Sequence, residues 1–309
     1  MKKPKRITGG HSACPGCGIF PGVEMFLRGI EGDVVMINQT GCAYVVSANY
    51  PYSAHKGNYI HNLFQNGAST LSGSLEAIFT LKDRGEIEFD DAATFVMLSG
   101  DGGMDIGMGP AIGAALRNHK MIVLEYDNEG YMNTGAQLSY STPIGHRTST
   151  SNIGKLSAGK EFDHKDTVQI MAATNIPYVF TGVDAFPQDL VRKAAKAQWY
   201  ANNHGLVYGK ILISCPLNWK SEDKDGSTLL EHAVNSNFFP LYEIENGRTT
   251  ITYNPEEAGA KVKPEEWLKL MGKSKHLLKP ENEAVLNHFN SIIDRRWKKI
   301  VAKHEHPEL

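Results

Sequence analysis

The chain has 309 residues, a formal net charge of -2, and ordinary shares of hydrophobic (41%) and charged (21%) residues. This length allows one large or two medium domains, with a core that needs no disulfide or metal for support. The nearly balanced charge argues against nucleic acid as a partner.

The start of the chain, Met1–Arg6, is basic, but the apolar core of a signal peptide does not follow it. No stretch approaches the roughly 20 apolar residues that would span a bilayer. We therefore expect a cytoplasmic protein, in which the cysteines are reduced and act as ligands or catalytic groups.

Five short apolar runs lack polar alternation, which is typical of strands buried on both faces of a parallel sheet. They are Val34–Asn38, Thr94–Gly100, Met121–Asp127, Tyr178–Val183 and Leu206–Ser214. Segments with helical periodicity lie between them, at Asn66–Lys82, Asp105–His119 and Pro187–Asn203. This alternation predicts an α/β domain with a doubly wound parallel sheet over residues 1–218.

Two regions depart from the alternation. Asn133–Lys165 is rich in Ser, Thr and Gly, and an irregular loop of this length is usually functional or covered by a partner. Beyond residue 218, Phe238–Tyr242 and Thr249–Tyr253 have the pattern of extended segments, and Glu281–Val301 that of a closing helix. We expect residues 219–309 to be an irregular C-terminal extension that packs on the core or on another subunit, or a plain structural tail.

The Gly-Asp-Gly-Gly sequence at residues 100–103 comes at the end of the predicted strand Thr94–Gly100 and precedes a helix, and Asn128 directly follows the next predicted strand. Neighbouring parallel strands bring Asp101 and Asn128 to the same carboxyl edge, where ligands bind in open α/β sheets. Carboxylate and amide oxygens suit Mg²⁺, while Gly102 and Gly103 let backbone amides approach phosphate oxygens at a helix N-terminus. The alternative is an ordinary turn followed by an unrelated Asn.

The only four cysteines are Cys14 and Cys17, in a C-x-x-C turn, and the isolated Cys42 and Cys215. The last two follow predicted strands, so all four can meet at one edge of the sheet. Four thiolates suit a [4Fe–4S] cluster or Zn²⁺. A structural zinc site usually pairs two C-x-x-C turns, and this chain has one, which favours the cluster.

With these motifs the sequence resembles the β subunit of the 2-oxoacid:ferredoxin oxidoreductases, the pyruvate synthase family. The resemblance extends over nearly the whole chain. Its matching stretches are Gly10–Gly18, Thr40–Cys42, Ile60-His61 with Asn66–Ala68, Gly100–Gly107, Tyr126–Gly135, Ser214–Trp219, Phe239–Gly247 and Arg295–Trp297.

The resemblance implies a thiamine diphosphate-binding fold with one [4Fe–4S] cluster on the four cysteines. It implies that Asp101, Asn128 and the Gly130 carbonyl hold Mg²⁺, and that Asn133 and His61 are the catalytic candidates. The residues implied to line the thiamine site are Thr40, Gly41, Cys42, Ala43, His61, Gly102, Gly103, Met132 and Asn133.

The resemblance also implies partners. No glutamate here matches the one that activates thiamine, which in the family comes from an α subunit. No cysteines remain for the ferredoxin-type clusters, which would lie in further γ- or δ-type subunits and lead to ferredoxin. The chain would therefore be catalytically complete only in a hetero-oligomer.

We infer the expected substrate from the segment after Cys42, where pyruvate enzymes of this family tend to have acidic residues and tryptophan. This chain has His55, Lys56 and Asn58 there, a more basic neighbourhood that would suit the second carboxylate of oxalate. The favoured expectation is therefore an oxalate oxidoreductase β subunit that cleaves oxalate to two CO₂. Pyruvate:ferredoxin oxidoreductase is the alternative, and a non-redox thiamine enzyme with structural zinc is a more distant one.

Overall fold

The computed structural model describes residues 5–49 and 51–308. Lys2 and Lys3 of the basic start, and Tyr50 in the segment used to predict the substrate, lie outside the described residues. None of the helices in the described ranges is both long and apolar enough to cross a membrane.

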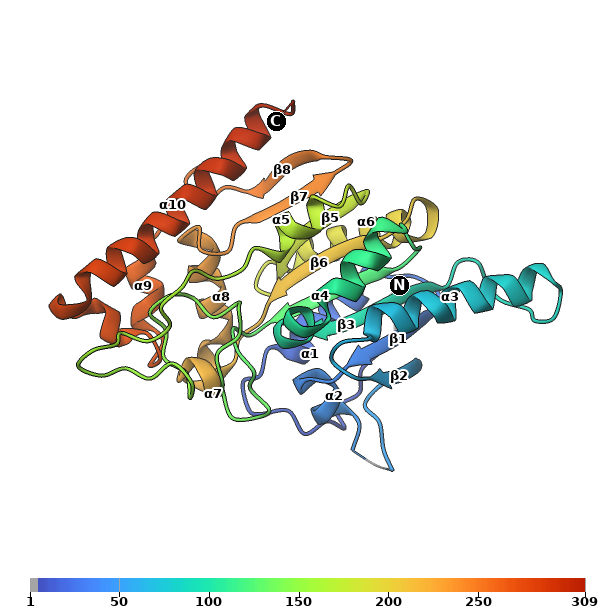
Figure 1. Ribbon diagram of the computed structural model, residues 1–309, viewed down its shortest axis with the longest axis horizontal. Helices are drawn as coiled ribbons and strands as arrows, with labels where there is room; N and C mark the ends of the chain where they lie inside the picture. Colours follow the sequence, from blue (N-terminus) through green and yellow to red (C-terminus); the bar gives the residue numbers. More distant parts are fainter. Residues whose placement is uncertain (1–4, 50, 309) are drawn as a thin grey trace.

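In the described part of the chain, one eight-stranded sheet has the order β2-β1-β3-β4-β6-β5-β7-β8 (Figure 1). The first six strands in the order are parallel, and β7 and β8 extend the sheet antiparallel beyond β5. The strands are β1 (Val34–Gln39), β2 (Asn58–Asn62), β3 (Thr94–Gly100), β4 (Ile122–Asp127), β5 (Tyr178–Val183), β6 (Val207–Leu212), β7 (Leu241–Glu245) and β8 (Arg248–Tyr253). The predicted fold class and the five predicted parallel strands are confirmed.

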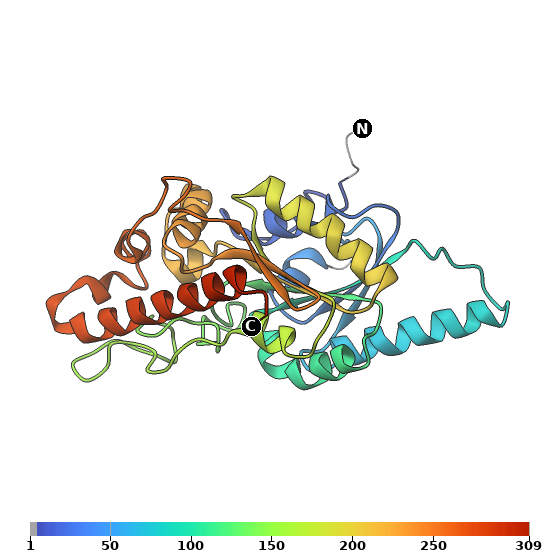
Figure 2. The same ribbon diagram turned by 90° about the horizontal axis from the view of Figure 1, so that it is seen from above.

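Helices cover both faces of this sheet (Figure 2). On one face lie α1 (Ile19–Leu27) and α6 (Pro187–Asn203), and on the other lie α3 (Gly67–Asp83), α4 (Asp101–Leu116) and α5 (Thr167–Ala172). Every residue of β3, β4 and β6 is therefore buried, which explains why these strands are apolar without alternation.

Helix α4 begins four residues before the predicted start, directly after β3. Gly100 is the extended N-cap residue, and the Asp101-Gly102-Gly103 sequence itself forms the first turn. The N-terminal end of α4 thus lies at the carboxyl edge of the sheet, close to the ends of β1 and β4.

The remaining described elements are the short α2 (Cys42–Ser47) and the C-terminal helices α7 (Pro216–Trp219), α8 (Gly226–Asn235), α9 (Pro264–Lys269) and α10 (Glu283–Glu305), with three 3₁₀ turns at Asp223–Asp225, Lys275–Leu278 and Pro280–Asn282. The C-terminal helices share a core with the ends of β5 and β6, in which Trp219, Trp267 and Phe289 are fully buried. A domain division after residue 218 stays a prediction.

Candidate functional site

Asp101 and Asn128 lie side by side at the carboxyl edge of the sheet. Gly100 of β3 is in register with Tyr126 of β4, so the two parallel strands end next to each other. Each of the two side chains is only 3% exposed. The side-chain oxygen of Asn128 is buried without a hydrogen-bond partner. Because leaving a buried oxygen unpaired costs free energy, this pair of oxygens fits a bound cation.

A cavity of about 210 Å³ lies against this pair. Its walls include most of the predicted site residues: Thr40, Gly41, Cys42, Asp101, Gly102, Gly103, Asn128, Gly130, Met132 and Asn133. The sequence had not indicated the other wall residues, chiefly Phe64, Ile106, Tyr126, Tyr131 and Thr134. Aromatic and aliphatic walls with a few polar groups are typical of a cofactor site.

Two predicted residues do not line this cavity but support its wall. The amide of Ala43, which is buried, donates to the hydroxyl of Tyr126 at 3.1 Å. His61 is exposed, and its Nε2 lies 2.9 Å from the hydroxyl of Thr40. The imidazole also stacks on Tyr44, with ring centroids 3.5 Å apart, and desolvation lowers its pKa.

The glycines of the cavity wall are required by close packing. A Cβ atom on Gly103 would lie 2.4 Å from the Ser99 hydroxyl, and one on Gly102 would lie 2.7 Å from the ring of Tyr131. Because Gly102 and Gly103 lack a Cβ atom, the backbone of the first turn of α4 can pack this closely and reach the cavity surface. A helix N-terminus that faces a cavity favours a negatively charged group such as a diphosphate.

The long irregular loop closes over Asp101 from the outside. The hydroxyl of Ser139 donates to the Asp101 carboxylate at 2.5 Å, and Lys165 Nζ donates to the Asp101 carbonyl at 2.9 Å. Burial and the neighbouring Asp127 carboxylate raise the pKa of Asp101 well above its ordinary value. A cation bound at this carboxylate would favour its ionised form.

A buried charge network continues from Asp101 into the sheet. Lys165 Nζ lies 2.6 Å from Asp105 and 3.3 Å from Glu125, and Lys210 Nζ lies 2.7 Å from Asp127. Asp105, Glu125 and Asp127 are thus paired with two ammonium groups, whereas the Asp101 carboxylate makes no ion pair among the described residues and stays available to a cation. Apart from Asp101, the network was not predicted, because buried ion pairs between distant segments carry no sequence motif.

The C-x-x-C turn docks onto the segment that carries Cys215. Gly18 N donates to the Ser214 carbonyl at 2.9 Å, and Gly16 adopts a φ of +69°. A Cβ atom on Gly16 would lie 2.4 Å from the carbonyl oxygen of Asp223, so only glycine allows this approach. The packing brings Cys14 and Cys17 close to Cys215.

The thiols influence one another electrostatically. Burial, followed by the charges of Cys215 and Cys17, raises the pKa of Cys42 to about 12. Burial likewise raises the pKa of Cys215 to about 11, with Cys17 and Cys14 adding to the shift. All four cysteines are free, and within residues 5–49 and 51–308 no three His, Cys, Asp or Glu side chains are placed to hold a single metal ion.

The backbone amide of Asn133 connects the cysteines with the cavity. It donates to the Cys42 sulfur and thereby opposes the increase in the pKa of that thiol. Since Cys42 and Asn133 both line the cavity, the cysteine group adjoins the Asp101–Asn128 pair.

The residues on which the expected oxalate substrate was based lie outside this cavity. His55, Lys56 and Asn58 line a separate cavity with Asp33 and Val34, at the start of β1. His55 stacks on Tyr59, with ring centroids 4.6 Å apart, and burial lowers its pKa. These three side chains therefore do not form a basic wall beside Asp101.

The fold and the site define a thiamine diphosphate-binding domain. Residues 39–208 match the family model described as "Thiamine pyrophosphate enzyme, C-terminal TPP binding domain". A solved 2-oxoglutarate:ferredoxin oxidoreductase from Magnetococcus marinus has the same fold, with a TM-score of 0.53, 23% identity, and 70% of each chain covered.

Proteins with similar sequences define the family of thiamine-dependent enzymes more closely. The chain is 37% identical to pyruvate synthase subunit PorB of Thermotoga maritima, over 98% of this chain and 94% of that protein. It is 34% identical to ketoisovalerate oxidoreductase subunit VorB of Pyrococcus horikoshii, over 89% of this chain and 87% of that protein. The chain belongs to the family of PorB-like β subunits of the thiamine-dependent 2-oxoacid:ferredoxin oxidoreductases.

Proposed function

We propose that this chain is the β subunit of a pyruvate synthase, which converts pyruvate and coenzyme A into acetyl-CoA and CO₂ and delivers the two electrons to ferredoxin. The observation that carries the proposal is the buried Asp101–Asn128 pair beside a cavity whose wall includes a cysteine of the four-thiol group. The comparisons favour the pyruvate alternative over oxalate, since relatives named pyruvate synthase match over most of the chain. The location of His55, Lys56 and Asn58 in a separate cavity also weakens the case for oxalate.

The cavity residues fit Mg²⁺ and thiamine diphosphate. Asp101, Asn128 and the Gly130 carbonyl would hold the cation, and the amides of Gly102 and Gly103 would face the diphosphate. Thr40, Gly41, Cys42, Met132 and Asn133 would surround the rest of the cofactor, with Ala43 and His61 supporting that wall. When bound, thiamine diphosphate supplies the electron sink that makes loss of CO₂ from a 2-oxoacid possible.

The chain's own side chains would prepare this chemistry. The apolar walls formed by Phe64, Ile106 and Met132 would exclude water, which strengthens electrostatic interactions inside the cavity. The exposed side-chain amide of Asn133, at the rim of the cavity, would orient the substrate. His61 would contribute indirectly, through its contact with the hydroxyl of Thr40 in the cavity wall. We retain Asn133 and His61 as the catalytic candidates.

We further propose that Cys14, Cys17, Cys42 and Cys215 hold one [4Fe–4S] cluster that receives the electrons. The support is that Cys42 lines the cavity and interacts electrostatically with Cys17 and Cys215, because an electron acceptor must lie close to its donor. A zinc ion on the same thiols would have no electron-transfer role, so metal analysis separates the two assignments.

The relatives' names describe subunits, which supports a multi-subunit enzyme. We propose that an α subunit contributes the glutamate that activates thiamine, and that γ- or δ-type subunits hold the further clusters leading to ferredoxin.

Assay of the assembled complex tests the substrate. The complex is purified without oxygen, and reduction of a viologen dye is followed with pyruvate plus coenzyme A, with 2-oxoisovalerate plus coenzyme A, and with oxalate. We expect the highest kcat/KM with pyruvate. A higher value with oxalate would overturn the pyruvate assignment while leaving the family membership unchanged.

A further inference from the structure

Lys165 connects the end of the long loop with the candidate magnesium site. Its ammonium group donates to the Asp101 carbonyl at 2.9 Å and contacts Asp105 at 2.6 Å and Glu125 at 3.3 Å. The Lys165 side chain is 7% exposed, and both carboxylates are fully buried. Lys165 thus fixes the backbone of the first residue of α4 and neutralises part of the charge behind Asp101.

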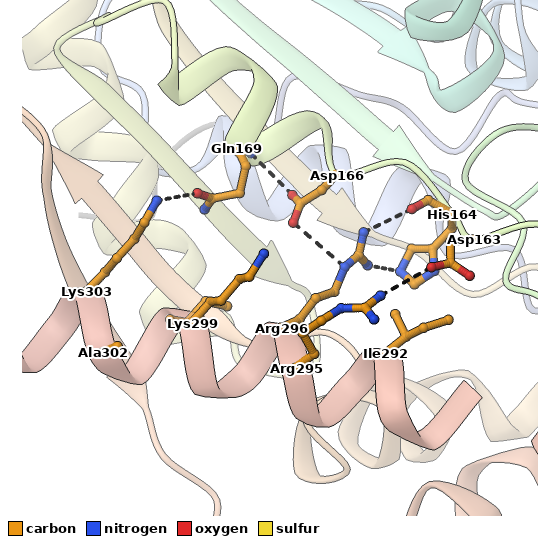
Figure 3. A pocket seen from close by; sticks show the side chains of 11 residues that line it. Asp163, His164, Asp166, Gln169, Ile292, Arg295, Arg296, Lys299, Ala302 and Lys303 are labelled. Atoms are coloured by element: carbon orange, nitrogen blue, oxygen red, sulfur yellow. Dashed lines mark hydrogen bonds and ion pairs between the residues drawn. The ribbon is translucent and has the colours of Figure 1, made fainter. Parts of the chain in front are cut away.

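The segment that carries Lys165 is held from its other side by the C-terminal helix α10 (Figure 3). Arg296 donates to the His164 carbonyl at 3.0 Å and to the His164 ring, and its Nε lies 3.8 Å from the Asp166 carboxylate. The residues on both sides of Lys165 in the sequence are therefore tied to one guanidinium group, on a side chain that is 23% exposed.

We propose that Arg296 is a positioning residue for the magnesium–diphosphate site, acting through Lys165 from 131 residues further along the chain. This inference depends on the proposed function, because it assumes that Asp101 binds the cation of thiamine diphosphate. It gives the C-terminal extension a role in cofactor binding that no residue of the cavity wall reveals.

The physical reason lies in the irregular backbone around Lys165. No helix or strand is present between Asp127 and Thr167 in the described chain. At Lys165 the backbone amide donates to the Tyr140 carbonyl at 2.8 Å, and the side-chain ties of the neighbouring residues complete the positioning of this segment. The planar guanidinium of Arg296 binds two neighbouring residues in a fixed geometry, which an ammonium group does not reproduce. Without it, Lys165 would move relative to Asp101, and small displacements of a binding group are costly.

The same cavity offers a matched control. Lys299 lines the cavity of about 670 Å³ between α10 and the segment 163–169, as Arg296 does (Figure 3). Within the described residues, Lys299 makes no hydrogen bond or ion pair to the segment. Its removal changes the charge of the cavity without changing the position of Lys165.

The test uses the assembled complex freed of its cofactor, with Arg296→Met, Lys165→Met, the double variant and Lys299→Met. Calorimetric titration with thiamine diphosphate at fixed Mg²⁺ gives the Kd, and dye reduction at saturating cofactor gives kcat. We expect Kd to rise about tenfold for each of the first two variants, a typical cost of losing a supporting contact. The double variant should match Lys165→Met, because the two residues act in series. Lys299→Met should stay within about twofold of wild type.

Different results overturn different statements. If wild type shows no saturable binding of thiamine diphosphate, the proposed function fails. If wild type binds and Arg296→Met binds equally tightly, or if Lys299→Met weakens binding as much, the positioning role fails. Should Arg296→Met not assemble, Arg296→Lys keeps the charge but loses the forked geometry. An unchanged Kd in that variant would also count against the role, and a several-fold increase would support it.

Discussion

Asp101 and Asn128 are brought together by the register of two parallel strands, in which Gly100 is paired with Tyr126. Asp101 begins α4 and Asn128 follows β4, so both buried side chains extend from the carboxyl edge of the sheet. The hydroxyl of Tyr126 in turn accepts the Ala43 amide, so the same register also positions the turn that carries Cys42.

Replacing Asp101 by Asn should weaken cofactor binding strongly. The substitution keeps the size of the side chain but removes the negative charge, and we expect the Kd for thiamine diphosphate with Mg²⁺ to rise by about 100-fold or more, beyond the cost of a supporting contact. Titration calorimetry of the complex measures this change. Asp83→Asn, at the exposed end of α3, is the control. Equal affinities of Asp101→Asn and wild type would remove Asp101 from the site.

Gly16→Ala should disrupt the cysteine turn. The new Cβ would lie 2.4 Å from the Asp223 carbonyl, and the φ of +69° is unfavourable for alanine. We expect a loss of more than about 1 kcal/mol in stability and a lower iron content. Gly9→Ala is the matched control, because a Cβ there meets nothing within 4 Å. If both variants retain the same iron per chain, the turn tolerates a side chain and the packing explanation is wrong.

Cys215→Ala should remove the cluster without removing the cofactor cavity. Cys215 follows β6 and is not part of the cavity wall, so we expect loss of iron and of the brown colour with only a small change in the affinity for thiamine diphosphate. Metal analysis and the visible spectrum of anaerobic protein measure the first effect. Ser12→Ala, near the same turn, is the control. One zinc per wild-type chain and no iron would contradict the cluster assignment.

Asp184→Asn should increase stability in a pH-dependent way. Burial raises the pKa of Asp184 to about 6, and one of its carboxylate oxygens is unpaired. The pKa of Asp184 is higher in the folded state than in the unfolded state. Its contribution to the stability of the folded protein is therefore fully present below about pH 4 and is lost as the pH rises through 6. The variant should therefore exceed wild type by about 1–3 kcal/mol at pH 8 and by about half of that difference at pH 5. Urea unfolding at both pH values measures the difference, and a gain that is larger at pH 5 would contradict the assignment.

Much of the fold could be predicted from local patterns. The strands β1, β3, β4, β5 and β6 are apolar without alternation because helices cover both faces, and α6 has the predicted bounds Pro187–Asn203. Strand β2 was missed because it lies at the edge of the sheet and is mostly exposed, so its sequence carries no burial pattern. The start of α4 was placed late because glycines normally oppose a helix, whereas here close packing requires them.

The sequence by itself determined the class of fold and the meeting of Asp101 with Asn128 at one edge of the sheet, because these follow from residue type, spacing and the edge rule for parallel sheets. Only the tertiary structure decided what surrounds them. Lys165 contacts Asp101 from 64 residues further along the chain, and Arg296 contacts His164 from 132 residues further along. His55 faces a separate cavity although it follows Cys42 closely in the chain. Such relationships depend on the path of the backbone through space, which local periodicity does not encode.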